Sequence, residues 1–212
     1  GDYSFNDPNR AVDCGTGLTT ATSIEGFNII GSSLGTYSVA LFCKDSSPTI
    51  TDCIIYAGGN PASLGDYDKS AITVSGTTSG DSQPHITNCI INFEGSGGTN
   101  TKWCAGISIY DYGKPRISCC QIFSGNTSTT APDATSFGIR ATFLAGSDPI
   151  VIDRNIIESG AGTTSKAISL ESVPDTPIHI NNNIIKSGPA ITTTIGINSE
   201  SCQLFIRNNT II

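Results

Sequence analysis

The chain is poor in charged residues, in aromatic residues and in residues that favour helices. Only 14% of its 212 residues are charged and only 7% are aromatic, the formal net charge is −7, and methionine is absent. A protein that binds nucleic acid needs a basic face, so we expect no nucleic-acid partner. The same balance disfavours docking on anionic membranes. No apolar run in the sequence approaches the ~20 residues of a membrane-spanning helix, so we expect no membrane span.

Several well-known catalytic motifs are also absent. The sequence contains no GxGxxG, phosphate-binding loop, GxSxG or HExxH motif, so nothing in it points to nucleotide use or to zinc-peptidase chemistry. Its two histidines, His85 and His179, stand alone, and a lone histidine is usually an ordinary surface residue.

What the sequence has instead is a long repeat rich in Gly, Ser, Thr, Asn and Ile. The stretch SSPTITDCII, residues 46–55, recurs in altered form down the chain, at intervals of 26 to 36 residues. Aligning the copies gives a first column of isoleucines, which is Ile24, Ile50, Ile86, Ile117, Ile152, Ile180 and Ile206. Five residues later stands a second column, which is Ile29, Ile55, Ile91, Ile122, Ile157, Ile185 and Ile211. Repeats of this length indicate a solenoid.

A second pattern lies between successive copies. A small residue is followed by an aliphatic one, in Ala40-Leu41, Ala71-Ile72, Gly106-Ile107, Gly138-Ile139, Ala167-Ile168 and Gly196-Ile197. The next inward position comes two residues after the aliphatic one, a period that is typical of a strand with one buried face. The best partner of each strand is its equivalent one turn later, ~4.8 Å away. We therefore predict an all-β chain that folds as a parallel β-solenoid of about seven rungs.

This repeat, from SSPTITDCII to the following AITV, resembles the right-handed parallel β-helix of the pectin-lyase-like superfamily. It is most similar to the β-helix repeat proteins that bacteria secrete or display on the cell surface. The resemblance implies a right-handed coil over residues 22–212, with residues 1–21 as an N-terminal cap or partial rung. It also implies a secreted or cell-surface location. Because the last copy stops in mid-rung, we expect the segment to belong to a longer parent protein.

Between the two isoleucine columns lies a column of different chemistry, which is Phe27, Cys53, Cys89, Cys120, Asn155, Asn183 and Asn209. A metal site of stacked thiols is one interpretation. We favour the other, an internal ladder at a tight bend, because the spacing is not that of known zinc sites. Small thiols pack well inside, and asparagine amides can hydrogen-bond from rung to rung. Proteins that the chain resembles often show such an asparagine ladder.

The spacing of neighbouring rungs also decides whether cysteines of one column can form disulfides. In-register Cβ atoms of neighbouring rungs lie ~4.8 Å apart, which exceeds the ~3.8 Å of a disulfide. We therefore predict free thiols at Cys53, Cys89 and Cys120. One or two disulfides stay open among the remaining cysteines, which are Cys14, Cys43, Cys104, Cys119 and Cys202.

The residues just before this column predict a left-handed bend in each turn. They are Gly26, Asp52, Asn88, Cys119, Arg154, Asn182 and Asn208. Gly, Asn and Asp tolerate left-handed backbone best, so only Cys119 and Arg154 depart from the preference. The residues just after the column include Ile54, Ile90, Ile156 and Ile184. These form an exposed apolar ridge unless the bend turns them into partial burial, which we slightly favour.

The resemblance implies a ligand groove on the sheet that carries the small-aliphatic pairs. The row expected to face outward there is Phe42, Thr73, Ser108, Arg140, Ser169 and Asn198. Candidate catalytic residues are Arg140, Glu171 and Asp111, and candidate ligand-binding residues are Tyr110, Tyr112, Asp66, Tyr67 and Asp68. Aromatic rings stack on sugars and an arginine can hold a carboxylate with two hydrogen bonds. Ordinary solvated surface is the alternative.

Two classes of function stay open. One is a noncatalytic module that acts as a spacer or binds a polysaccharide or a surface protein. The other is a polysaccharide lyase or glycoside hydrolase with its groove at Tyr110, Arg140 and Glu171. Lyases of this superfamily need several acidic Ca²⁺ ligands, and hydrolases need paired carboxylates. No tight Asp/Glu group falls on neighbouring rungs. We therefore favour the noncatalytic class, without a cofactor, and expect Ca²⁺ only if the lyase alternative holds.

Overall fold

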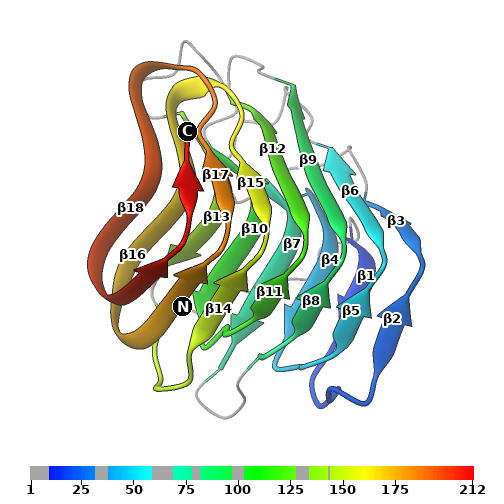
Figure 1. The fold of residues 1–212 in the computed structure, drawn as a ribbon. Helices are drawn as coiled ribbons and strands as arrows, with labels where there is room; N and C mark the ends of the chain where they lie inside the picture. The colour runs from blue at the N-terminus through cyan, green and yellow to red at the C-terminus, as the bar shows by residue number, and fades with distance from the viewer. Residues whose placement is uncertain are drawn as a thin grey trace.

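The structure is a computed structural model that describes residues 10–31, 38–58, 69–77, 82–96, 103–127, 134–142 and 144–212. Its elements in these ranges are all β-strands, and every strand pair is parallel. The chain therefore forms an all-β parallel solenoid, and the coil is right-handed, as predicted (Figure 1). No helix long and apolar enough to cross a membrane occurs in these ranges.

Three faces of the coil run along its length (Figure 1). The first, here called face 1, consists of β1 (Arg10–Cys14), β4 (Ser38–Lys44), β7 (Lys69–Gly76), β10 (Trp103–Asp111) and β13 (Thr135–Thr142). Face 2 consists of β2 (Ser23–Glu25), β5 (Thr49–Thr51), β8 (His85–Thr87), β11 (Arg116–Ser118) and β14 (Ile150–Asp153). Two long strands, β16 (Gly162–Asn181) and β18 (Ala190–Arg207), continue from face 1 into face 2.

Face 3 is a separate sheet of seven strands, β3 (Asn28–Ile30), β6 (Ile54–Gly58), β9 (Ile90–Ser96), β12 (Gln121–Asn126), β15 (Ile156–Glu158), β17 (Ile184–Lys186) and β19 (Thr210–Ile211). The predicted number of rungs was slightly too high, because the solenoid has about five turns. Among the described residues, the strands of the first and last of the seven repeats have a neighbour on one side only.

The predicted register is confirmed throughout. The first isoleucine column is paired from Ile24 to Ile206 along face 2. The second is paired from Ile29 to Ile211 along face 3. The aliphatic member of each small-aliphatic pair is likewise aligned with its equivalent along face 1. These three columns meet inside the coil, where the isoleucines of the central turns are fully buried.

The bend between faces 2 and 3 has the predicted left-handed backbone in every turn. Its φ angles are 73° at Gly26, 54° at Asp52 and Asn88, 57° at Asn182 and 53° at Asn208. The two residues that break the sequence preference adopt the same conformation, with φ of 55° at both Cys119 and Arg154. The packed isoleucines on either side therefore impose the bend on residues that do not favour it.

All eight cysteines are free in the structure, so none of the disulfides left open by the sequence is formed. Cys14, Cys43 and Cys104 are buried, Cys202 is half-buried and Cys119 is exposed. Among these five, Cys14 and Cys43 are register partners on neighbouring strands.

Candidate functional site

The outer surface of face 1 differs from the prediction. The row expected to face solvent is largely buried, including Phe42, Thr73, Ser108 and Ser169. Long side chains of the same sheet lie flat over it rather than extending into water. The Arg10 guanidinium lies 3.9 Å from the centre of the Phe42 ring. Covering the sheet in this way removes polar and apolar surface from solvent together.

A cluster of cationic and aromatic side chains occupies the centre of this outer surface. The Arg140 guanidinium lies 4.6 Å from the centre of the Trp103 ring and 5.3 Å from that of Phe137. The Lys166 ammonium lies 5.9 Å from the Phe137 ring. Strands β10, β13 and β16, which are adjacent in the sheet, supply these residues. With Glu171 they form what we call the outer cluster: Trp103, Phe137, Arg140, Lys166 and Glu171.

The carboxylate of Glu171 is held from two sides. The Ser169 hydroxyl donates to Oε1 at 2.9 Å, and the Lys166 ammonium donates to the same oxygen at 3.2 Å. Burial alone raises the pKa of Glu171, but the Ser169 hydrogen bond and the charges of Lys166 and Arg140 outweigh it and lower the pKa overall. Glu171 is therefore a stable carboxylate, suited to orienting the two cations and unsuited to donating a proton.

Two hydroxyls beside the outer cluster are buried and make no hydrogen bond within the described part of the chain. They are Ser108 Oγ and Thr142 Oγ1, and both residues are 1% exposed. Ser108 is the register partner of Arg140, and Thr142 is the register partner of both Tyr110 and Glu171. Buried hydroxyls usually have a partner, so this spot has hydrogen-bonding capacity that the described residues do not use.

The structure brings some predicted site residues together and leaves others apart. Arg140 and Glu171 belong to the outer cluster, and Tyr110 lies in the same row as Glu171. Asp111 is instead the last residue of β10. It is exposed there and accepts a hydrogen bond from the Ser75 hydroxyl at 3.4 Å.

Tyr112 lies one residue further along the chain. Its ring centre is 6.0 Å from the Lys114 ammonium. The predicted residues Asp66, Tyr67 and Asp68 lie outside the described residues.

Sequence reasoning missed Trp103, Phe137 and Lys166. In face 1 the small residue and the aliphatic residue after it both face inward, so the strict alternation of the strand is interrupted there. A Cβ built on Gly106 would lie 2.6 Å from Ile122 in the core, while the following Ile107 is itself fully buried. The residue immediately before each small residue therefore faces outward, and that position holds Phe137 and Lys166. The aromatic and cationic residues at this position were the feature of the sequence that could have revealed the cluster.

Inside the coil, asparagine side chains link successive turns. Asn155 N and Nδ2 donate to Asn183 Oδ1 at 2.8 and 3.0 Å, and Asn183 N and Nδ2 donate to Asn209 Oδ1 at 2.8 and 2.9 Å. Cys120 N donates to Asn155 Oδ1 at 2.9 Å, which joins the asparagines to the cysteines of the same column. The sulfur contacts are longer, with Cys89 N at 3.5 Å from Cys120 Sγ. No group of three or more His, Cys, Asp or Glu residues that could hold a metal ion occurs in the described ranges.

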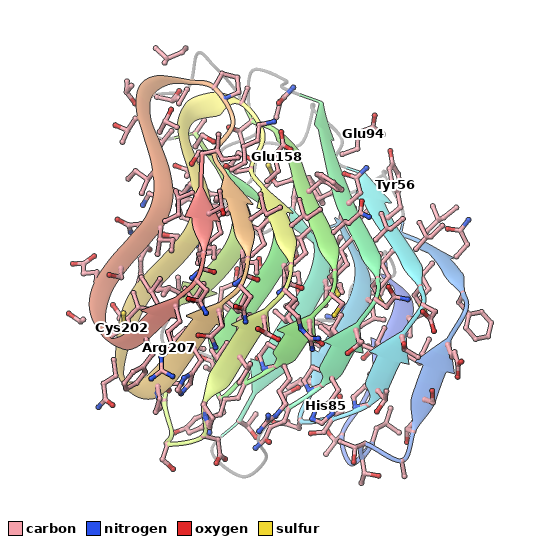
Figure 2. All side chains as sticks on the ribbon, viewed as in Figure 1. Tyr56, His85, Glu94, Glu158, Cys202 and Arg207 are labelled. Atoms are coloured by element: carbon pink, nitrogen blue, oxygen red, sulfur yellow. The ribbon has the colours of Figure 1, made fainter. Side chains whose placement is uncertain are left out.

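Face 3 presents the isoleucine ridge to solvent. Ile54, Ile90, Ile156 and Ile184 are 47%, 40%, 41% and 44% exposed. The favoured expectation of partial burial was therefore wrong, because the bend keeps these side chains on the outer surface. Figure 2 shows Tyr56 and Glu158 along the same face, beyond the ridge.

Comparisons with known proteins found no matching family model, no matching curated protein and no matching solved structure.

Proposed function

We propose that this chain is a noncatalytic β-solenoid module that binds a polysaccharide on the outer surface of face 1. The observation that carries the proposal is the outer cluster, in which Arg140 is stacked on Trp103 and Phe137 beside Ser108 and Thr142. A secreted or cell-surface location and kinship with the pectin-lyase-like superfamily are part of the same proposal.

The chemistry of the cluster suits a sugar ligand. The half-buried Trp103 ring offers apolar area to the face of a sugar ring at a low entropic cost, because few side-chain torsions need to be fixed, whereas the buried Phe137 ring supports Arg140. The Ser108 and Thr142 hydroxyls beside the cluster are buried, so the contacts with a sugar come from Trp103 and Arg140. Arg140 offers a planar set of donors that fits a carboxylate or sulfate group. Stacking on Trp103 and Phe137 holds this guanidinium in place before any ligand binds.

The state of Glu171 favours binding over catalysis. Glycoside hydrolysis needs a carboxylic acid that gives its proton to the leaving group, usually with a raised pKa. The pKa of Glu171 is lowered instead, and Ser169 and Lys166 both donate to its Oε1. The polysaccharide lyase or hydrolase alternative is therefore the second candidate.

The test uses the natural fluorescence of Trp103, which is the single tryptophan of the chain. A panel of acidic and neutral polysaccharides is titrated into the protein, with and without Ca²⁺, and affinity is measured in parallel by calorimetry. We expect at least one polysaccharide to change the Trp103 emission saturably. In that titration Arg140→Gln should weaken binding by about tenfold or more, the loss of one charge-assisted contact.

Arg116→Gln is the matched control, since Arg116 lies on face 2 and its loss should leave affinity unchanged. Each reaction is also read for unsaturated products and new reducing ends. Turnover that Glu171→Gln abolishes would replace the binding proposal by the enzymatic one. The binding proposal would be overturned if the folded protein bound no polysaccharide of the panel. It would also be overturned if the two arginine variants lost affinity equally.

A further inference from the structure

Two buried thiols meet at one edge of face 1. Cys14 is the last residue of β1, and its register partner on the parallel strand β4 is Cys43. Their exposed fractions are 1% and 0%, and the two thiols are close enough for each to shift the pKa of the other. Register partners have Cα atoms about 4.8 Å apart, which lies within the roughly 4.4–6.8 Å that disulfides span. The Cβ–Cβ separation of register partners, ~4.8 Å, is about 1 Å longer than the ~3.8 Å of a relaxed disulfide.

The position of β1 in the sheet allows that approach. Within the described residues, strand β1 lies at the edge of the sheet and pairs with β4 alone. The Cys14 carbonyl accepts a hydrogen bond from the Ser46 hydroxyl at 2.8 Å, and such a side chain can follow a small displacement of the strand. An edge strand can therefore move toward its neighbour without breaking a second sheet ladder.

The interior of the coil offers a matched pair that lacks this freedom. Cys89 and Cys120 are also buried neighbours in successive turns, and their thiols likewise shift the pKa of each other. They are held from both sides, because Cys120 N donates to Asn155 Oδ1 and Ile90 N donates to the Cys53 carbonyl, each at 2.9 Å. Closing these two sulfurs would strain contacts with the turns before and after.

We propose that Cys14 and Cys43 are an oxidation site, which a small-molecule disulfide converts to a disulfide that fixes β1 to β4. The Cys14 thiolate attacks one sulfur of the small disulfide, so that a mixed disulfide forms and one small thiolate leaves. Cys43 then attacks the Cys14 sulfur, the second small thiolate leaves, and it takes up the Cys43 proton. Two protein thiols are oxidised and one small disulfide is reduced to two thiols.

The contact between the two groups supports this order of attack. The hydrogen bond from the Cys43 thiol lowers the pKa of Cys14, and that of Cys43 is raised well above its ordinary value by the same contact and by burial. Cys14 is therefore the thiol that ionises first, and only the thiolate attacks a disulfide. Because β1 is at the sheet edge, Cys14 is also the member of the pair that an opening of the edge would expose.

The experiment incubates the whole 212-residue chain in buffers of oxidised and reduced glutathione over a wide range of ratios. A second series refolds the chain in the same buffers, so that glutathione can reach the thiols before the folded coil buries them. After acid quenching, free thiols are alkylated under denaturing conditions and linkages are mapped by mass spectrometry. We expect a single linkage, Cys14 to Cys43, at ratios that leave Cys89 and Cys120 alkylated.

Hydrogen exchange provides the structural readout. Oxidation should slow exchange of the β1 amides by about tenfold or more while leaving β12 unchanged, and dithiothreitol should reverse it. Cys14→Ser and Cys43→Ser should each abolish both effects. Free thiols at Cys14 and Cys43 in the most oxidising buffer of both series would overturn the proposal. So would a stable glutathione adduct on Cys14 without the cross-link, or parallel oxidation of Cys89 and Cys120.

Discussion

Replacing Asn183 by alanine tests how much the asparagine column contributes to stability. The side chain is 1% exposed and joins three turns. Its Oδ1 accepts from Asn155 N and Nδ2 at 2.8 and 3.0 Å. Its Nδ2 donates to the Ile152 carbonyl at 3.0 Å and to Asn209 Oδ1 at 2.9 Å. Alanine removes all of these contacts at once and leaves their partners inside the coil.

The cost follows from which partners are left behind. A hydrogen bond contributes about 1 kcal/mol net, whereas a buried donor without an acceptor costs about 1–3 kcal/mol. The Asn155 N–H loses the acceptor 2.8 Å away and is too deep for water to replace it readily, since Asn155 is 1% exposed. The Ile152 carbonyl and the Asn209 amide oxygen lose one donor each. We therefore expect Asn183→Ala to lower the free energy of unfolding by about 4 kcal/mol.

The control is Cys120→Ala, in the cysteine half of the same column. The sulfur accepts from Cys89 N at 3.5 Å and donates to the Ser118 carbonyl at 3.2 Å, and thiol hydrogen bonds are weak. Its loss should cost about 1–2 kcal/mol, mainly in packing contacts. Equilibrium urea unfolding of both variants measures the difference, and hydrogen exchange at the Asn155 amide localises it. Equal losses, or a loss below about 2 kcal/mol for Asn183→Ala, would refute the reasoning.

Five further substitutions test the packing, the bends and the charge of the coil. Gly138→Ala should destabilise by about 2–3 kcal/mol, because the new Cβ would lie 2.6 Å from a backbone oxygen of the next turn. Gly196→Ala, in the same column, meets a side chain and no backbone atom, with Ile211 Cγ2 at 2.4 Å, and should cost less in the same urea titration. At Cys119, where φ is 55°, asparagine should raise the melting temperature and valine should lower it, since left-handed backbone suits asparagine and strains a β-branched residue. Burial and then the Arg116 charge lower the pKa of His85 in the folded state. The unfolded chain therefore binds the proton more readily, so the His85 contribution is complete above the ordinary pKa of about 6.5 and is lost as pH falls from there through the lower pKa of the folded state. His85→Asn should flatten this part of the stability profile.

The parts of the fold that the sequence predicts are those where one residue type repeats under one physical demand. Isoleucine recurs wherever a side chain must fill the interior of the coil, and the columns from Ile24 and Ile29 pair in the predicted register. Gly26, Asp52 and Asn88 mark a bend that needs a positive φ, and the structure has it. The number of complete turns was less predictable, because a repeat in the sequence looks the same whether or not its strands have neighbours on both sides.

The outer surface of face 1 was less predictable because the strand is not regular there. Phe137 and Arg140 are three residues apart, so simple alternation would place them on opposite faces of the sheet. Both nevertheless lie on the outer face, with the Arg140 guanidinium 5.3 Å from the centre of the Phe137 ring. They can do so because the two residues between them, Gly138 and Ile139, both face the interior. Gly138, which lets the turns approach closely, is thus also the residue that places Arg140 on the Phe137 ring. The packing of the core and the candidate binding surface therefore have one local cause.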